Sequence, residues 1–127
     1  MKKKYLVTGG SGFIGSALVK KLLSEGHSVR VFDNNSRGNL RRLESVINRI
    51  EFVEGDIRDF SQVEEACKDI DAVCHLAFVN GTKFFYELPE LVLEVGVKGM
   101  INILDACITH YIDDLILASS SEVYQSP

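Results

Sequence analysis

The sequence lacks a long apolar run, an excess of basic residues, and any CxxC pair or cluster of histidines. Without roughly 20 consecutive apolar residues, it contains no candidate membrane span. Its net charge of −4 leaves no basic surface that would favour nucleic acid. The lysines after Met1 precede a predicted strand rather than the apolar core of a signal peptide. We therefore expect a cytoplasmic protein without membrane or nucleic-acid partners.

Cysteine and histidine are too few and too scattered for a disulfide framework or a metal site. The three cysteines are an odd number, and each lies in an apolar stretch. We expect them to be reduced residues of the core, as is usual in the cytosol. The three histidines occur singly, so we predict no metal site. These residues are Cys67, Cys74, Cys107, His27, His75 and His110.

The composition is that of an ordinary globular domain. With 127 residues, of which 46% are hydrophobic and 25% charged, the chain fits one domain spanning residues 1–127. Five short runs rich in Val, Ile and Leu alternate with helical stretches, which predicts a βαβ organisation. Because the runs are almost continuously apolar, they favour a parallel sheet covered on both faces, in a Rossmann-like doubly wound α/β fold with strand order 3-2-1-4-5. The predicted strands are residues 5–7, 28–32, 51–53, 72–74 and 115–118.

Helical spacing and end signals predict three helices, over residues 14–24, 61–67 and about 89–110. The first ends at Gly26, and Glu64 completes a capping box in the second. The third has Pro89 in its first turn. A polar loop over 34–42 leads into a further short helix. The predicted apolar face of the long helix consists of Leu91, Val92, Val95, Ile101, Leu104 and Ile108.

A glycine-rich turn, TGGSGFIG at residues 8–15, connects the first predicted strand to the first helix. Gly10, Gly12 and Gly15 satisfy GxGxxG, in which glycines serve the tight turn, the close approach of a ligand and helix packing. The helix that follows directs free N–H groups at a phosphate. The pattern alone is also compatible with an ordinary strand-to-helix turn.

Asp33 strengthens the dinucleotide interpretation. It ends the second predicted strand about 20 residues after the glycines, where a carboxylate can bind a ribose 2′-hydroxyl. A P-loop is disfavoured, because Ser16 and Ala17 follow Gly15 where Lys and Ser or Thr would be required. A carboxylate repels the 2′-phosphate of NADP, so Asp33 predicts NAD, with Arg37 as the one nearby counterargument.

Small or polar residues follow all five predicted strands. Each group could be a solvated loop, but the exits of parallel strands share one edge of the sheet, where ligands bind in open α/β folds. We therefore expect one crevice to collect them. They are residues 8–9, 33–34, 55–56, 75–77 and 119–121.

These motifs, in this order, resemble the extended short-chain dehydrogenase/reductases, specifically the sugar-nucleotide epimerase/dehydratase branch. The resemblance covers the whole chain and is based on the glycine turn, Asp33, GDIRD at 55–59, HLA at 75–77, VKG at 97–99 and SSSEVY at 119–124. It implies NAD as cofactor and a nucleotide sugar as substrate of the parent enzyme. The cofactor-binding residues that we expect are Gly9, Gly12, Phe13, Ile14, Gly15, Asp33, Asn34, Asp56, Ile57, Leu76 and Ala77.

Within this resemblance each group of residues has a role. The glycine turn holds the pyrophosphate, Asp33 the adenosine ribose, and Asp56 and Ile57 flank the adenine. Leu76 and Ala77 pass beneath the cofactor. Ser120 matches the family's catalytic Ser or Thr, whose hydroxyl binds the sugar oxygen that is oxidised.

Glu122 is a tentative second catalytic residue. The Ser-Ser-Glu run that it ends resembles the Thr-Ser-Glu of UDP-glucuronate decarboxylases. A Glu near the nicotinamide could act as an acid or base, or it could cap the exit of the last strand.

The chain also departs from the family pattern. Gly96 and Met100 replace the usual Asn and Thr of the long helix, and Phe78 replaces the usual Ala after HLA, so we expect a narrower pocket.

No Tyr-x-x-x-Lys pair is present, although the family's chemistry needs one to remove the sugar hydroxyl proton. We therefore expect the NAD-binding, amino-terminal part of a longer enzyme, truncated and inactive alone. A stand-alone NAD-binding or sensing module and a fold that binds nothing are the alternatives. An apolar stripe on the helix at 89–110 and the edge of the strand at 115–118 predict self-association, such as a homodimer or an exchanged element.

Overall fold

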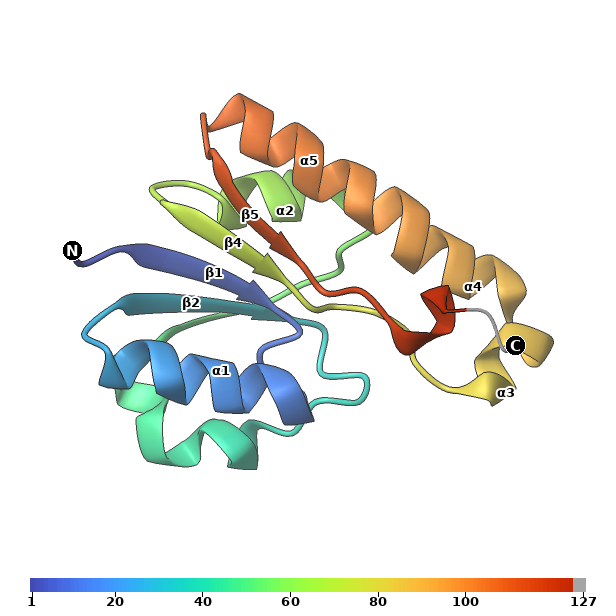
Figure 1. Ribbon diagram of the computed structural model, residues 1–127, viewed down its shortest axis with the longest axis horizontal. Helices are drawn as coiled ribbons and strands as arrows, with labels where there is room; N and C mark the ends of the chain where they lie inside the picture. Colours follow the sequence, from blue (N-terminus) through green and yellow to red (C-terminus); the bar gives the residue numbers. More distant parts are fainter. Residues whose placement is uncertain (125–127) are drawn as a thin grey trace.

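The structure is a computed structural model that describes residues 1–124. A five-stranded parallel sheet forms its centre (Figure 1). The spatial order is β3-β2-β1-β4-β5, which confirms the predicted Rossmann-like arrangement. The strands begin and end within one or two residues of the predicted runs: β1 Lys4–Thr8, β2 Ser28–Asp33, β3 Glu51–Glu54, β4 Ala72–His75 and β5 Asp114–Leu117.

Helices cover the two faces of the sheet, which makes a three-layer fold (Figure 1). The helix α1 (Phe13–Ser24) and the 3₁₀ helix η1 (Leu40–Arg49) lie on one face, and α2 (Phe60–Ala66) and α5 (Gly99–Thr109) lie on the other.

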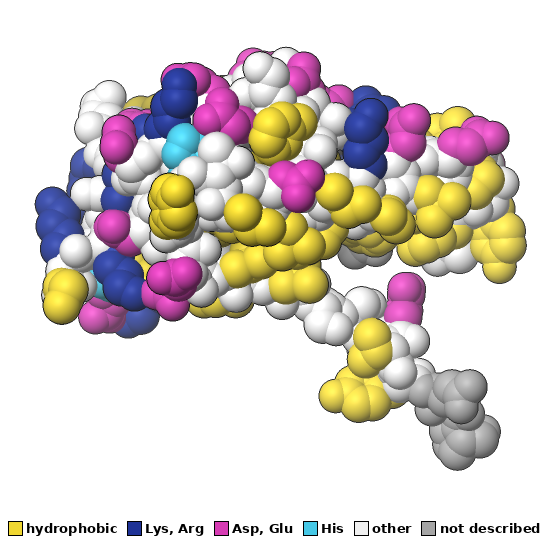
Figure 2. Space-filling model, turned by 90° about the horizontal axis from the view of Figure 1, so that it is seen from above, with side chains coloured by type: hydrophobic (Ala, Val, Ile, Leu, Met, Phe, Trp, Pro, Cys, Tyr) yellow, Lys and Arg dark blue, Asp and Glu magenta, His cyan; other side chains and the backbone are white. Residues whose placement is uncertain are grey.

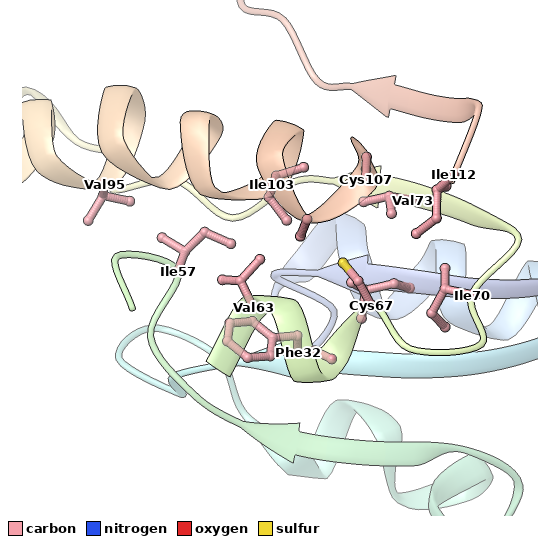
Figure 3. Close-up of a cluster of buried hydrophobic side chains, with 13 residues drawn as sticks. Phe32, Ile57, Val63, Cys67, Ile70, Val73, Val95, Ile103, Cys107 and Ile112 are labelled. Atoms are coloured by element: carbon pink, nitrogen blue, oxygen red, sulfur yellow. The ribbon is translucent and has the colours of Figure 1, made fainter. Parts of the chain in front are cut away.

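Each face has its own core, because successive side chains of a strand point to opposite sides of the sheet. The neighbours Leu6 and Val7 are both fully buried but belong to different clusters. Val7 packs in the cluster of Val19 from α1, whereas Leu6 lies in that of Ile103 from α5. Figure 3 shows the cluster of Leu6 and Ile103, which lies between the sheet and the helices α2 and α5.

The start of α2 differs from the prediction. Asp59 is its N-cap, and the Asp59 side chain accepts a hydrogen bond of 3.2 Å from the backbone N–H of Gln62. The capping box with Glu64 is therefore wrong. Glu64 Oε1 instead lies 2.8 Å from Nε2 of His110, which joins α2 to the end of α5.

The predicted long helix is continuous but contains a widened turn. It runs through α4 (Pro89–Leu93), a π-helical segment η2 (Glu94–Lys98) and α5, and the unpredicted short helix α3 (Thr82–Glu87) precedes it. Its predicted apolar face is wrong at three positions in α5, namely Ile101, Leu104 and Ile108, all of which are exposed. Ile103 and Ala106 are buried instead. Because α5 is apolar on two sides, composition alone does not show which side packs on the sheet.

The outward side of this helix forms a stripe of exposed apolar residues, hereafter the outer stripe. Ile101 is 50% exposed and Ile108 73% exposed. Figure 2, seen from the α5 side, shows apolar side chains gathered in a band across the molecule. Ile116 and Leu117 of the edge strand β5 are also more than half exposed. The outer stripe consists of Leu93, Val97, Ile101, Leu104 and Ile108.

The cysteines are buried and free, as predicted. Burial raises the pKa of the Cys67 thiol to about 12 and also raises those of Cys74 and Cys107. All three are therefore protonated at neutral pH and act as small apolar residues. Within residues 1–124, no helix is both long and apolar enough to cross a bilayer.

Candidate functional site

A hollow opens at the carboxyl ends of β1, β2, β3 and β4, where the predicted strand exits meet. It has a volume of about 150 Å³. Most of the residues expected to bind a cofactor line it, and they come from four separate parts of the chain. These residues are Gly9, Gly12, Asp33, Asn34, Asp56, Ile57, Leu76 and Ala77.

The glycine turn is packed too tightly for larger residues. Gly9 has a left-handed backbone with φ of +71°, and a Cβ atom there would lie 3.0 Å from the backbone nitrogen of Ala77. A Cβ atom on Gly15 would lie 2.1 Å from the carbonyl oxygen of Gly9. Gly15 is buried, and its missing side chain serves the packing of α1 on the turn. Although we expected Gly15 to bind the cofactor, it is not among the described residues that line the hollow.

The amino-terminal end of α1 begins beside the hollow. Gly12 is its N-cap and lines the hollow, and no side chain within residues 1–124 caps this helix. The first N–H groups of an α-helix have no partner inside the helix and carry a partial positive charge. Phe13 and Ile14 were predicted to bind the cofactor, but neither is among the described residues that line the hollow. Their side chains are apolar and exposed, so only their backbone N–H groups can serve an anion at this point.

Asp33 links the glycine turn to the loop after β2. Its carboxylate accepts hydrogen bonds from the backbone N–H of Ser11 at 3.0 Å and of Asn35 at 2.9 Å, one on each oxygen. The Ser11 hydroxyl bonds to the Asn35 side chain at 3.1 Å. Each carboxylate oxygen has a second lone pair. The carboxylate is thus held in place by the backbone while keeping acceptor capacity for a ligand.

Asp56 is held by an ion pair at another side of the hollow. Arg58 Nη2 lies 2.7 Å from Asp56 Oδ2, and Arg58 Nη1 lies 2.8 Å from Glu94 on the long helix. The hydrogen bond from Arg58 is the main reason that the Asp56 pKa lies below its usual value. The following residue, Ile57, is buried and its carbonyl accepts a hydrogen bond of 2.9 Å from Asn102.

Thr8 and His75 form a buried pair at the ends of β1 and β4, which are aligned in the sheet. Thr8 Oγ1 lies 2.7 Å from Nδ1 of His75 and accepts hydrogen bonds of 3.1 Å from the backbone N–H groups of Leu76 and Ala77. Burial lowers the pKa of His75 to about 4, so the ring is neutral at pH 7. With both lone pairs of Oγ1 engaged, the Thr8 hydroxyl donates to Nδ1, and the pair holds the loop beneath the hollow.

The sequence analysis assigned no role in the site to several lining residues. Gly38 lies so close to Ser11 that a Cβ atom there would be 1.7 Å from the Ser11 hydroxyl oxygen. Arg37 reaches from the same loop to donate a hydrogen bond to the carbonyl of Asn80. The Ser-Arg-Gly run after Asp33 was the available signal, since a polar glycine loop follows the acidic residue. The lining residues without an assigned role are Phe32, Ser36, Gly38, Val79 and Val95.

Comparison with known proteins then gives the family. The sequence matches the model of the NAD dependent epimerase/dehydratase family over residues 5–127. The chain belongs to this family.

Individual relatives agree with this assignment. The chain is 37% identical over 124 residues to the UDP-N-acetyl-alpha-D-glucosaminuronate decarboxylase of Bacillus cytotoxicus, covering 98% of this chain and 38% of the relative. It is 36% identical over 130 residues to a UDP-glucose 4-epimerase of Klebsiella pneumoniae, covering 95% of this chain and 91% of the relative.

A solved structure confirms the fold. The UDP-glucose 4-epimerase of Thermus thermophilus in complex with NAD superposes with a TM-score of 0.85 and is 37% identical. The match covers 92% of this chain and 37% of that one. This member of the epimerase/dehydratase family thus spans less than two-fifths of the length of that epimerase and of the Bacillus decarboxylase.

The predicted catalytic residues of this epimerase/dehydratase family member lie apart from the hollow. Ser120 and Glu122 follow β5 and are exposed, and neither is among the described residues that line the hollow. The Ser120 side chain caps a short 3₁₀ helix, η3 (Ser121–Val123), by accepting a hydrogen bond of 3.2 Å from the backbone N–H of Glu122. This segment projects away from the body of the molecule (Figure 2). The structure therefore brings together most of the residues predicted to bind the cofactor, but not the residues predicted to be catalytic.

Proposed function

We propose that this chain binds NAD in the hollow and forms the cofactor-binding part of a nucleotide-sugar enzyme. The main support is the placement of the Asp33 carboxylate beside the glycine turn and the start of α1. A fixed carboxylate next to a helix N-terminus provides a ribose acceptor beside a pyrophosphate site, which is the combination that a dinucleotide site uses.

The residues of the hollow fit the two halves of this ligand. The close contact of Gly9 with Ala77 leaves the backbone accessible to the pyrophosphate, and the uncapped N–H groups of α1 would donate to it. Asp33 would accept hydrogen bonds from the ribose hydroxyls. Ile57 offers an apolar contact for the adenine, and Asp56 an acceptor for its amino group.

For the whole protein we propose oxidation of a UDP-sugar hydroxyl, followed by epimerisation or decarboxylation. When bound, NAD accepts and returns a hydride in such reactions. The names of the relatives support this class, since they are UDP-sugar epimerases and decarboxylases. Ser120 remains our proposal for the hydroxyl that binds the sugar oxygen, and Glu122 for an additional acid or base.

Titration calorimetry with NAD and NADP tests the cofactor assignment. We expect NAD to bind more tightly than NADP, because the Asp33 carboxylate would repel a 2′-phosphate. Asp33→Asn should weaken NAD binding by about tenfold or more, the effect of losing hydrogen bonds to a charged group. The exposed Asp113→Asn, remote from the hollow, is the matched control and should bind normally. Tighter binding of NADP, or equal binding by both variants, would contradict the assignment.

We also propose that the chain self-associates through the outer stripe. Its members recur at spacings of four, four, three and four residues, which is the pattern of a helix that packs along a second helix. The occupant we propose is a second copy of this chain. Light scattering should show a dimer that Ile101→Glu converts to a monomer, and a monomeric wild-type chain would exclude this association.

We also propose a cytosolic location, which the buried free cysteines support.

A further inference from the structure

Phe78 and Gly96 meet at the rim of the hollow, where an aromatic ring lies against a helical residue without a side chain. Phe78 follows Ala77 in the loop after β4 and lines the hollow. A Cβ atom on Gly96 would lie 2.8 Å from Cε2 of the Phe78 ring. The ring therefore occupies the space that any larger residue at position 96 would need.

Gly96 lies within the π-helical turn Glu94–Lys98, directly after Val95, which lines the same hollow. Glycine destabilises a helix interior relative to alanine, and π turns often occur at functional sites. The position thus lacks the stability that alanine would supply and gains room for a ring. The two departures noted in the sequence, at positions 78 and 96, are complementary in the structure.

Phe78 is 51% exposed although its side chain is large and apolar. It lines the same hollow as Asp33 and Ile57, the residues proposed to bind adenosine, and as Val79 and Val95. An exposed ring within a hollow offers a flat apolar wall on which a nucleoside can pack.

We propose that Phe78 is a binding residue for the adenosine half of the cofactor. Gly96 is a positioning residue, because its missing side chain leaves the space that the Phe78 ring needs to lie at the wall of the hollow. This inference rests on the proposed NAD-binding function. It predicts that Phe78 and Gly96 act as a unit, so that the effects of the two substitutions on ligand binding are not additive.

Three substitutions follow from this proposal. Phe78→Ala removes the ring and should weaken NAD and ADP-ribose by the same factor, about tenfold, as expected for the loss of one aromatic contact to a base. Gly96→Ala should displace the ring and weaken both ligands several-fold. In the double variant, Gly96→Ala should cause no further loss, because no ring remains to be displaced.

Calorimetry with NAD and ADP-ribose on the wild type, both single variants and the double variant provides the test. Phe85→Ala is the matched control, since Phe85 is similarly exposed but lies outside the hollow lining. If Phe78→Ala does not fold, Phe78→Leu takes its place and should still weaken both ligands at least threefold. Circular dichroism establishes that each variant is folded.

The possible results separate this inference from the proposed function. Three results would overturn the inference and leave the proposed NAD binding standing. Phe78→Ala could bind both ligands within twofold of the wild type, or it could weaken NAD but not ADP-ribose. Gly96→Ala could have an equal effect with and without Phe78. Failure of both the wild type and Phe85→Ala to bind NAD would overturn the proposed function and this inference with it.

Discussion

Acidification from pH 7 to pH 5 should destabilise the protein through His75. The ring is 5% exposed and lies against the Thr8 hydroxyl. Burial lowers the pKa of His75 from 6.5 to about 4. Between these two values the unfolded chain binds a proton that the folded protein does not bind. Stability is therefore complete above pH 6.5 and falls as the pH decreases through this window.

The size of the effect follows from the two pKa values. At pH 5 the ring is almost entirely protonated in the unfolded chain and about nine-tenths neutral in the folded protein, so the linkage relation gives a loss of about 2 kcal/mol relative to pH 7. That is a large fraction of the stability of a small domain, which is typically about 5–15 kcal/mol.

Urea denaturation at pH 7, 6 and 5, in the wild type and in His75→Asn, provides the assay. Asparagine can accept the Thr8 hydroxyl hydrogen bond but does not titrate. The variant should therefore lose about 2 kcal/mol less than the wild type between pH 7 and 5, whatever its stability at pH 7. His27 and His110 are the same in both proteins, so their contributions cancel in the comparison. An identical loss in the two proteins would refute the assignment of this window to His75.

Two further predictions concern the glycine turn and the strand that leads into it. Thr8→Val removes the side-chain acceptor shared by the backbone N–H groups of Leu76 and Ala77. Leu76 keeps a second acceptor in the backbone carbonyl of residue 8, so the loss falls chiefly on Ala77, and the free energy of unfolding should fall by about 2 kcal/mol. Thr109→Val, on an exposed helix end, should change it by less than about 0.5 kcal/mol, and equal effects in urea would contradict the reasoning. Gly15→Ala should lower stability by about 2 kcal/mol despite the higher helix propensity of alanine, because its Cβ atom would collide with the Gly9 carbonyl. A higher melting temperature for this variant would show that the turn can move.

Most of the fold could be predicted because its signals are local. Short apolar runs that alternate with helical patterns indicate parallel strands in a doubly wound fold, and the usual strand order of that fold is the one observed. The errors arose where a partner lies far away in the sequence. Glu64 fits a capping box locally, but its carboxylate contacts His110, which is 46 residues later. Ile101 is as apolar as Ile103, and only the packing of α5 on the sheet separates them.

The candidate site shows the same division. Gly9, Gly12 and Asp33 could be located from spacing, because a strand, a turn and a helix in sequence dictate their proximity. The Thr8–His75 pair joins residues 67 positions apart and depends on the register of β1 with β4. Nothing in either segment alone indicates that a threonine hydroxyl supports the loop of the other.

Because all strands are parallel, the edge of the sheet at their carboxyl ends and the edge at their amino ends differ in how well they tolerate inserted residues. All five strands run in the same direction, so the connections that return to the next strand, at residues 25–27, 50, 67–71 and 110–113, lie at the edge opposite the hollow. At the exposed residues Glu25 and Gly26, inserted chain such as an epitope or a fluorophore attachment sequence adds little closure entropy and does not enter the hollow. This connection is where the protein can be labelled or extended while ligand binding is observed at the other edge.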